Sequence, residues 1–167
     1  MENIQTILNY FTEYGLLFMF IIVFLEYMNL PGLPAGIIMP AAGILIASHG
    51  MNFGMALIVS VIAGLLGSYV LYFLGFFLGH SVLEKFYKKY KKLRPSIDKA
   101  VSYTEKHGNK GVFLERLIPV ARTLISLTVG TVRMNFVSFS FYSVLGITIW
   151  NLVFIYAGYA FGYLFLN

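Results

Sequence analysis

Two long apolar stretches, Phe53–Gly79 and Phe136–Leu166, most constrain what this chain can fold into. Each exceeds the roughly 20 apolar residues that a helix needs to cross the hydrocarbon core of a bilayer. Only 11% of the 167 residues are charged, and 59% are hydrophobic, whereas about 25% of the residues in a soluble domain are charged. The sequence therefore predicts an all-α integral membrane protein that forms one unit rather than two independent domains.

The positive charges are concentrated in one segment between the two apolar stretches. No lysine or arginine precedes Lys85, and nine of the twelve lie between Lys85 and Lys110. Because cytoplasmic loops of membrane proteins are rich in lysine and arginine, we expect residues 80–110 to lie on the cytoplasmic side of a multi-pass protein of the cell membrane. The lysines of this segment are expected to contact anionic lipid headgroups, and we expect no binding of nucleic acid.

The apolar sequence is interrupted twice in a similar way. FLEYMNLPGLPAGIIMPAAG, Phe24–Gly43, and FLERLIPVARTLISLTVG, Phe113–Gly130, both begin Phe-Leu-Glu, break at proline and run apolar to a glycine. A long apolar stretch follows each of them. This shared order of parts indicates an internal repeat, with one copy in residues 15–79 and the other in residues 111–167.

The lengths of the interrupted segments favour helical hairpins that enter the membrane and return to the same side. Leu16–Leu25 has ten residues and Ile37–Ala47 has eleven, and apolar runs of about 10 to 14 residues are typical of re-entrant or interfacial segments. Proline cannot continue a hydrogen-bonded helix, so the tips are placed at Pro31, Pro34, Gly36 and Pro119.

Counting the crossings gives an inverted repeat in which the two hairpins enter from opposite faces and both termini lie outside. Four or five ordinary spans remain the alternative topology. Residues 1–14 have apolar side chains at helical spacing and are expected to form a short interfacial helix. Their sequence has neither a positive n-region nor a small-residue cleavage site, so a cleaved signal is not expected.

Small residues four positions apart mark the faces through which the long helices are expected to pack: Gly75 with Gly79, Gly158 with Gly162 and Ala63 with Gly67. Small residues let helix backbones approach closely in lipid, where tight packing replaces the hydrophobic driving force. Packing within the chain is the preferred interpretation, and a homo-oligomer contact is the alternative. The glycines concerned are Gly67, Gly75, Gly79, Gly158 and Gly162.

Arg116 and Arg122 are the candidate binding residues. A charged side chain at the centre of a bilayer costs about 2.5–3.5 kcal/mol on insertion scales, so it requires a partner or a hydrated cavity. Positions six apart point in different directions on a continuous helix, but a break at Pro119 would let both arginines converge on one anion. Arginine suits bidentate binding of phosphate. The alternative is that both side chains extend to the membrane surface.

Glu26 and Glu115 are the acidic residues of the two interrupted segments. Each is a candidate charge partner for an arginine or a candidate proton carrier. The alternative is an interfacial carboxylate near the base of a hairpin. The chain has no cysteine, its three histidines lack metal-ligand spacing, and no nucleophile motif is present. We therefore expect no catalytic site, no metal and no cofactor, and hence no enzyme.

With these motifs in place, the whole chain resembles a single domain of the DedA family, within the superfamily that includes SNARE-associated Golgi proteins and VTT domains. The resemblance is carried by an Arg-x-x-Pro-x-x-Arg pattern and by glycines and aromatic residues in the two long stretches. The residues that match the family pattern are Arg116, Pro119, Arg122, Gly130, Met134 and Phe136, then Gly146, Trp150, Gly158, Tyr159 and Gly162, and in the first half Gly67, Tyr72, Gly75 and Gly79.

The chain departs from the family pattern at two acidic positions. Gly36 stands where a glutamate is usual, and Ser68 stands where an aspartate is usual. The resemblance implies a flippase-like or scramblase-like transporter that moves a phosphate-containing lipid between leaflets. Phosphatidylethanolamine is preferred, because a zwitterionic headgroup brings its own counter-charge. Undecaprenyl phosphate and a non-transporting membrane assembly factor are the alternatives. The missing acids lead us to expect transport that does not depend on protons.

Overall fold

The computed structural model describes residues 2–28, 35–89, 108–117 and 121–166, together with single positions at 95, 98, 102 and 106. Pro31, Pro34, Pro119 and much of the basic segment lie outside these residues. Within the described ranges all regular structure is helical, which confirms the predicted all-α class. The helices are α1 (Glu2–Tyr27), α2 (Ala35–Ser48), α3 (Phe53–Lys89), α5 (Asn109–Arg116), α6 (Ala121–Thr131) and α7 (Phe136–Leu166).

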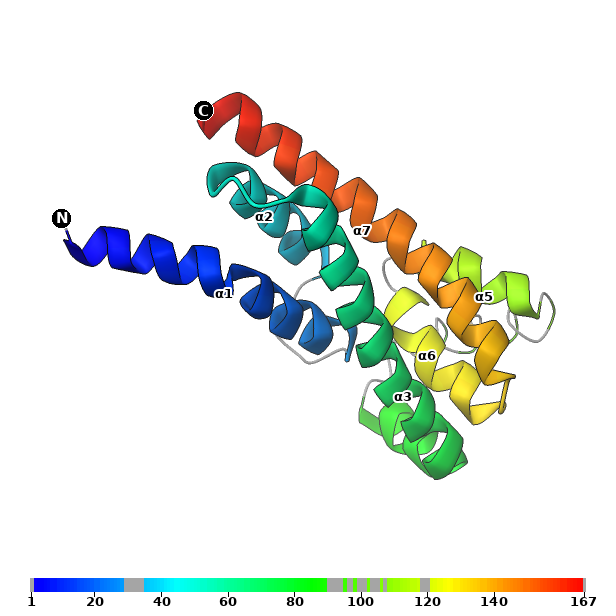
Figure 1. Cartoon of the computed structure of the whole chain (residues 1–167). Coiled ribbons are helices and arrows are strands. Elements are labelled where there is room, and N and C mark those ends of the chain that lie inside the picture. Colours follow the sequence, from blue (N-terminus) through cyan, green and yellow to red (C-terminus); the bar gives the residue numbers. More distant parts are fainter. Residues whose placement is uncertain are drawn as a thin grey trace.

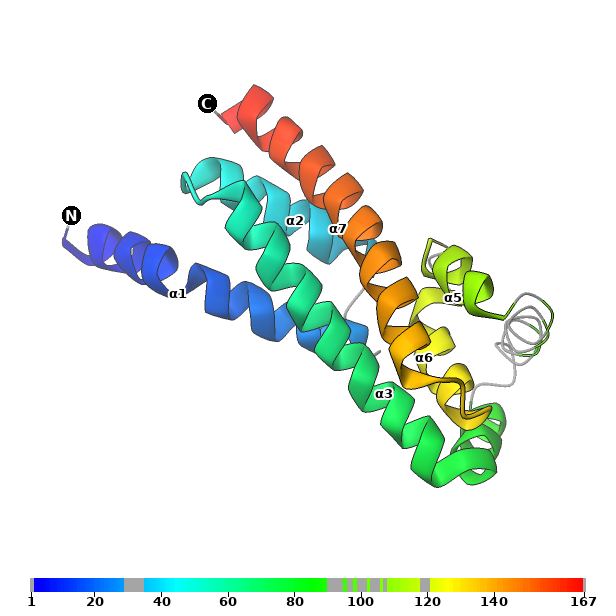
Figure 2. The ribbon, with the colours of Figure 1, turned by 45° about the vertical axis from the view of Figure 1, so that its right-hand side comes forward.

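The two long helices run antiparallel to each other, and the shorter helices pack around them (Figures 1 and 2). Phe53–Gly79 of α3 has 27 residues and a mean hydropathy of 2.2, and Phe136–Leu164 of α7 has 29 residues and a mean hydropathy of 1.7. Both helices expose large apolar side chains, among them Phe77, Val137 and Leu164. Contiguous apolar surface of this kind is rare on soluble monomers, and it suits contact with lipid.

Helix α1 ends against the middle of the apolar part of α3. A Cβ atom on Gly64 would lie 3.0 Å from the Tyr27 ring, and one on Gly67 would lie 2.7 Å from the Phe24 carbonyl oxygen. Helix α1 has 26 residues and continues through the predicted boundary between the interfacial helix and the first hairpin arm. Gly15, the helix-weakening residue nearest this boundary, costs only about 1 kcal/mol inside a helix.

Helices α2 and α7 approach each other through a pair of glycines. A Cβ atom on Gly43 would collide with the Ile155 carbonyl oxygen and lie 2.6 Å from the Tyr159 amide nitrogen. A Cβ atom on Gly158 would collide with the Pro40 carbonyl oxygen. The two backbones are therefore in direct contact, which only residues without a side chain permit.

Helices α3 and α6 meet in the same manner. A Cβ atom on Gly75 would collide with the Leu127 carbonyl oxygen, and one on Gly130 would collide with the Tyr72 carbonyl oxygen and lie 3.1 Å from the Phe76 amide nitrogen. The contacting residues of α3 lie 83 positions before those of α7, and those of α2 lie 87 positions before those of α6. The two helix pairs thus use equivalent residues.

Three other glycines differ in their surroundings. A Cβ atom on Gly162 would lie 3.1 Å from that of Ala47, so Gly162 is also part of the contact between α2 and α7. Gly79 has φ 45° and ψ −130° and kinks α3, and no described atom lies within 4 Å of its Cβ position. Gly79 therefore turns the chain instead of packing, contrary to expectation. Gly36, expected at the tip of the first hairpin, is the second residue of α2, which begins at Ala35.

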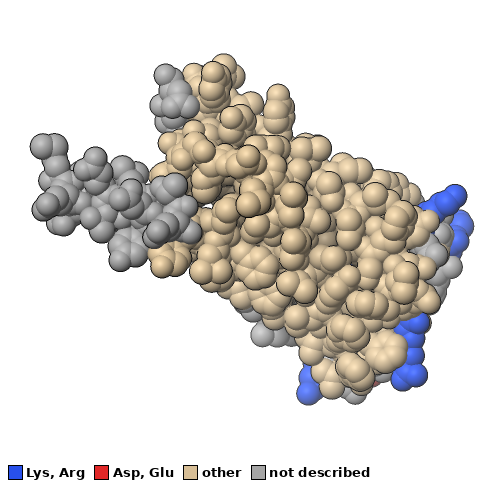
Figure 3. All heavy atoms as spheres, viewed as in Figure 1, with Lys and Arg blue, Asp and Glu red and all other residues tan. Residues whose placement is uncertain are grey.

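The exposed positive charges of the described residues gather at one end of the molecule (Figure 3). Lys85 and Lys88 follow the kink in α3, Lys110 lies in the first turn of α5, and Arg133 lies between α6 and α7; all four are exposed. The visible surface over the apolar helices carries no lysine or arginine. Charge is thus segregated along the direction of the long helices, as expected at one surface of a membrane.

Candidate functional site

Arg116 is the largest fully buried side chain among the described residues, with 1% of its surface exposed. Its Nη1 atom donates a hydrogen bond to Ser68 Oγ at 3.0 Å. Its Nη2 atom donates to Ser126 Oγ at 3.0 Å and to Ser143 Oγ at 2.9 Å. The guanidinium carbon also lies 5.5 Å from the centre of the Phe139 ring. We call Arg116 with these three serines the arginine–serine site.

Four helices contribute to the arginine–serine site. Arg116 is the last residue of α5, and its serine partners come from α3, α6 and α7. Gly146 of α7 makes room for the arginine, because a Cβ atom there would lie 2.5 Å from Arg116 Cβ. Ser68 lies near the middle of the apolar stretch Phe53–Gly79. The positive charge is therefore held at mid-depth of the predicted span.

Hydrogen bonds to serine hydroxyls can offset the cost of burying this charge. A hydrogen bond to a charged group contributes about 1.5–3 kcal/mol, and Arg116 makes three to the serines. The insertion cost of an arginine at the bilayer centre is about 2.5–3.5 kcal/mol. The serines are neutral, so these three bonds stabilise the cation without cancelling its charge. A guanidinium held in this way has the donor geometry that suits a phosphate group.

A second buried polar cluster joins α1, α3 and α7. The hydroxyl of Tyr27 donates to Asn151 Oδ1 at 2.9 Å, and Asn151 Nδ2 donates to Ser60 Oγ at 3.1 Å. Ser60 in turn donates to the Leu57 carbonyl oxygen at 2.7 Å. Tyr27, Asn151 and Ser60 are each at most 3% exposed. This tyrosine–asparagine cluster links the end of α1 to the middle of α7.

The two clusters occupy corresponding positions in the two halves of the chain. Ser60 and Ser68 of α3 lie 83 residues before Ser143 and Asn151 of α7, the same separation as in the glycine contacts. Tyr27 and Arg116 each directly follow the Phe-Leu-Glu of their half. Tyr27 bonds to Asn151, and Arg116 bonds to the equivalent Ser68. A neutral tyrosine thus stands in one half where the other half has a cation.

The remaining residues predicted for the site are only partly described. Glu26 is buried near the end of α1, with 2% of its surface exposed. Glu115 lies in α5 and Arg122 in the first turn of α6, but their side chains lie outside what the structure describes. The structure therefore leaves the convergence of Arg116 and Arg122 as a prediction. Among the described residues, no group of three histidine or acidic side chains is arranged to hold a metal ion.

Sequence reasoning missed the serines that bond Arg116 and the whole tyrosine–asparagine cluster. One signal was present in the sequence: Ser60 and Ser68 are eight residues apart in the first long stretch, as are Ser143 and Asn151 in the second. Small polar residues repeated at matching positions of two apolar helices indicate a buried polar network. No such pattern marks Ser126, because it lies after the second interruption, in a segment that contains both polar and apolar residues.

Taken together, the fold and the site define an all-helical membrane protein with a buried cation between long apolar helices and short ones. Residues 33–160 match the VTT domain family, which is most of the chain. The chain belongs to this family, that of the DedA proteins, as its relatives also show.

Relatives from several bacteria cover nearly the whole chain. The chain is 32% identical over 157 residues to Protein DedA of Escherichia coli (strain K12), covering 90% of this chain and 71% of that protein. It is 32% identical over 151 residues to undecaprenyl phosphate transporter A of Staphylococcus aureus, covering 88% and 74%. It is 31% identical over 166 residues to an alkaline phosphatase-like protein of Lactococcus lactis subsp. lactis, covering 96% and 76%. No solved structure matches the chain.

Proposed function

We propose that this protein moves a phosphate-containing lipid between the leaflets of the membrane, with the headgroup phosphate bound by Arg116. The observation that carries the proposal is the fully buried guanidinium, which three neutral serines bond at mid-depth of a predicted span. A cation placed there lowers the energy of an anionic headgroup where the bilayer itself offers no compensation. The lipid tails would remain in the hydrocarbon while the headgroup passes.

The serines suit exchange with a phosphate group. A hydroxyl is both a donor and an acceptor, so an oxygen that accepts from Arg116 can instead donate to a phosphate oxygen. A guanidinium–phosphate pair is bidentate and stronger than a guanidinium–hydroxyl contact. Because Arg116 is enclosed in this arrangement, entry of the headgroup requires α5 or α6 to move relative to α3 and α7. Arg122, and Glu26 or Glu115, are proposed to complete the site.

The glycine contacts and the polar clusters match between the two halves of the chain, and this match supports an inverted repeat with two re-entrant hairpins. Helix α2 packs on α7 through the same register that α6 uses on α3, and α3 and α7 are antiparallel (Figure 2). Tyr27, at the end of α1, bonds to the middle of the α7 span, and Arg116, at the end of α5, bonds to the middle of the α3 span. In the proposed topology, α1 and α5 therefore end at mid-depth instead of crossing the membrane.

The charged end of the molecule is proposed to face the cytoplasm, with the protein in the cell membrane. Single cysteines can test this topology, because the chain has none of its own. We expect Ser48→Cys and Lys88→Cys to react with an impermeant maleimide from opposite faces. Gly36→Cys should react only with a permeant maleimide, since the second residue of α2 lies near the proposed tip of the first hairpin. Labelling of Gly36→Cys from the Lys88 face would favour ordinary spans.

Two lipids are candidates for the substrate. A zwitterionic headgroup favours phosphatidylethanolamine, whereas the name of the Staphylococcus aureus relative favours undecaprenyl phosphate. Both present a phosphate to Arg116, so the arginine–serine site alone does not separate them. The alkaline phosphatase-like relative raises phosphate hydrolysis as a third activity. A transporter moves its lipid unchanged, whereas a phosphatase releases inorganic phosphate.

Purified protein in liposomes tests the proposal directly. Fluorescent phosphatidylethanolamine and labelled undecaprenyl phosphate are reconstituted in parallel, and loss of the inner-leaflet label is followed with a membrane-impermeant quencher. We expect faster exchange than in protein-free liposomes for at least one lipid, without phosphate release. The family pattern has an acid at the position of Ser68, which here accepts a hydrogen bond from Arg116, so the rate should not change when a proton gradient is dissipated.

The same liposomes identify the alternatives. Exchange no faster than in protein-free liposomes for both lipids would contradict the transport proposal and favour an assembly factor. Release of inorganic phosphate would point to an enzyme. A rate that depends on the proton gradient, with the dependence lost in Glu26→Gln, would make the buried Glu26 a proton carrier and would contradict passive transport.

A further inference from the structure

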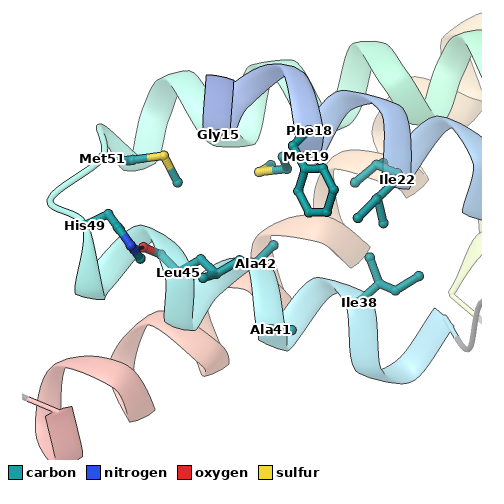
Figure 4. A pocket seen from close by; sticks show the side chains of 11 residues that line it. Gly15, Phe18, Met19, Ile22, Ile38, Ala41, Ala42, Leu45, His49 and Met51 are labelled. Atoms are coloured by element: carbon teal, nitrogen blue, oxygen red, sulfur yellow. Dashed lines mark hydrogen bonds between the residues drawn. The ribbon is translucent and has the colours of Figure 1, made fainter. Parts of the chain in front are cut away.

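Helices α1 and α2 diverge and leave a cavity of about 200 Å³ between them. Figure 4 shows side chains from both helices pointing into this space. Phe18, Met19 and Ile22 of α1 face Ile38 and Ala42 of α2. An apolar cavity of about 150 Å³ is large enough to bind benzene. We call this space the α1–α2 pocket.

The α1–α2 pocket opens toward the lipid rather than into the core of the protein. Phe18 and Leu45 line it, and they are 51% and 36% exposed on the surface. This surface belongs to the apolar helices that contact the bilayer, so hydrocarbon chains are the molecules present at the opening. Apart from His49, every lining side chain is apolar. Such a lining excludes a charged headgroup and favours a hydrocarbon tail.

The two ends of the α1–α2 pocket differ, which gives its occupant a direction. His49 and Met51 close one end, and Ile22 and Ile38 lie at the other (Figure 4). His49 precedes the turn that leads to α3 and its exposed Asn52, so this end lies nearest the membrane surface. Nδ1 of His49 donates to the Leu45 carbonyl oxygen at 3.1 Å, which orients the ring. The polar end is thus shallow and the apolar end is deep.

We propose that the α1–α2 pocket binds one acyl chain of a membrane phospholipid, with its headgroup at the level of His49 and its tail between Ile22 and Ile38. Met19 and Met51 suit this role, because a flexible thioether adapts to chains of different shape. The bound chain would fill the space between two helices that otherwise touch little. The site is separate from Arg116, which belongs to α5, and it does not depend on lipid transport.

A photoreactive phospholipid tests the site by binding alone. The protein is placed in nanodiscs that contain a phosphatidylethanolamine with a diazirine near the end of one acyl chain. It is illuminated, and adducts are mapped by mass spectrometry. Because the diazirine lies near the deep end of the proposed site, we expect adducts to concentrate on residues 18–23 and 38–42. Ala42→Phe, which fills the pocket, should reduce these adducts about tenfold, the change produced by a loss of about 1.4 kcal/mol of binding free energy.

Two further variants keep the test decisive. Ala41→Phe fills the pocket from an exposed position, so it serves where Ala42→Phe impairs folding, and it should give the same loss of adducts. Ala157→Phe makes the same change on the exposed side of α7 and should leave the adducts unchanged. Adducts spread evenly over all lipid-facing helices, insensitivity to both filling variants, or crosslinks to a second copy of the chain would overturn the proposal.

Discussion

Replacement of Arg116 by glutamine is expected to abolish lipid transport in liposomes while leaving a folded protein in the membrane. Glutamine keeps amide donors that can reach serine hydroxyls, but it carries no charge. The phosphate would lose charge-assisted hydrogen bonds of about 1.5–3 kcal/mol each. Loss of two such bonds lowers the exchange rate by at least about 100-fold. Arg116→Lys should retain part of the activity, since it keeps the charge but lacks the planar fork.

The control for this experiment is Arg133→Gln. Arg133 is an exposed arginine near the charged end, with its guanidinium carbon 5.3 Å from the centre of the Phe76 ring. Arg133→Gln also removes one positive charge, but at a position outside the arginine–serine site. It should therefore leave the exchange rate close to that of the wild type. Size-exclusion profiles establish that each variant is folded. A folded Arg116→Gln protein with wild-type exchange would show that Arg116 has only a structural role.

The fold class and the long helices could be predicted because both follow from the length of the apolar stretches in the sequence. A stretch such as Phe53–Gly79 is long enough to span a bilayer in a weakly charged chain, and the structure forms a helix there. The site could be predicted only in part. Arg116 stands out, since a charge in an apolar segment is costly. The partners of Arg116 could not be assigned, because a serine in an apolar helix can equally bond its own backbone, as Ser68 also does with the Gly64 carbonyl oxygen.

The sequence identified several glycines with a structural role, but it did not show which of them pack against a helix and which turn the chain. Gly75 and Gly79 form one motif in the sequence, yet Gly75 contacts the backbone of α6 while Gly79 kinks α3. Spacing identifies a face of a helix, but it does not show where the neighbouring helix ends. In the sequence, Gly43 only marks the end of an interrupted segment, although it forms the contact with α7 together with Gly158. A packing glycine is recognised only when both of the helices it joins are known.

Gly158→Ala is expected to destabilise the protein strongly, although it adds a single methyl group. The new Cβ atom would collide with the Pro40 carbonyl oxygen and lie 2.7 Å from the Pro40 carbonyl carbon. Both are backbone atoms, so α2 as a whole must move away from α7. Overpacking of a tight contact costs about 1–3 kcal/mol. The fraction of protein that stays monodisperse after heating, measured by size-exclusion chromatography, should fall at a lower temperature than in the wild type.

Two matched alanine variants decide how this result is interpreted. Gly36→Ala lies in α2, where no described atom is within 4 Å of the new Cβ atom, and it should be as stable as the wild type. Gly75→Ala makes the equivalent collision, with the Leu127 carbonyl oxygen, and should destabilise the protein by a similar amount. If Gly158→Ala is harmful and Gly75→Ala is tolerated, the two helix pairs are not energetically equivalent, and the proposed inverted repeat loses its main structural support. Equal losses of stability would mean that α2 depends on its contact with α7 to the same degree as α6 depends on its contact with α3.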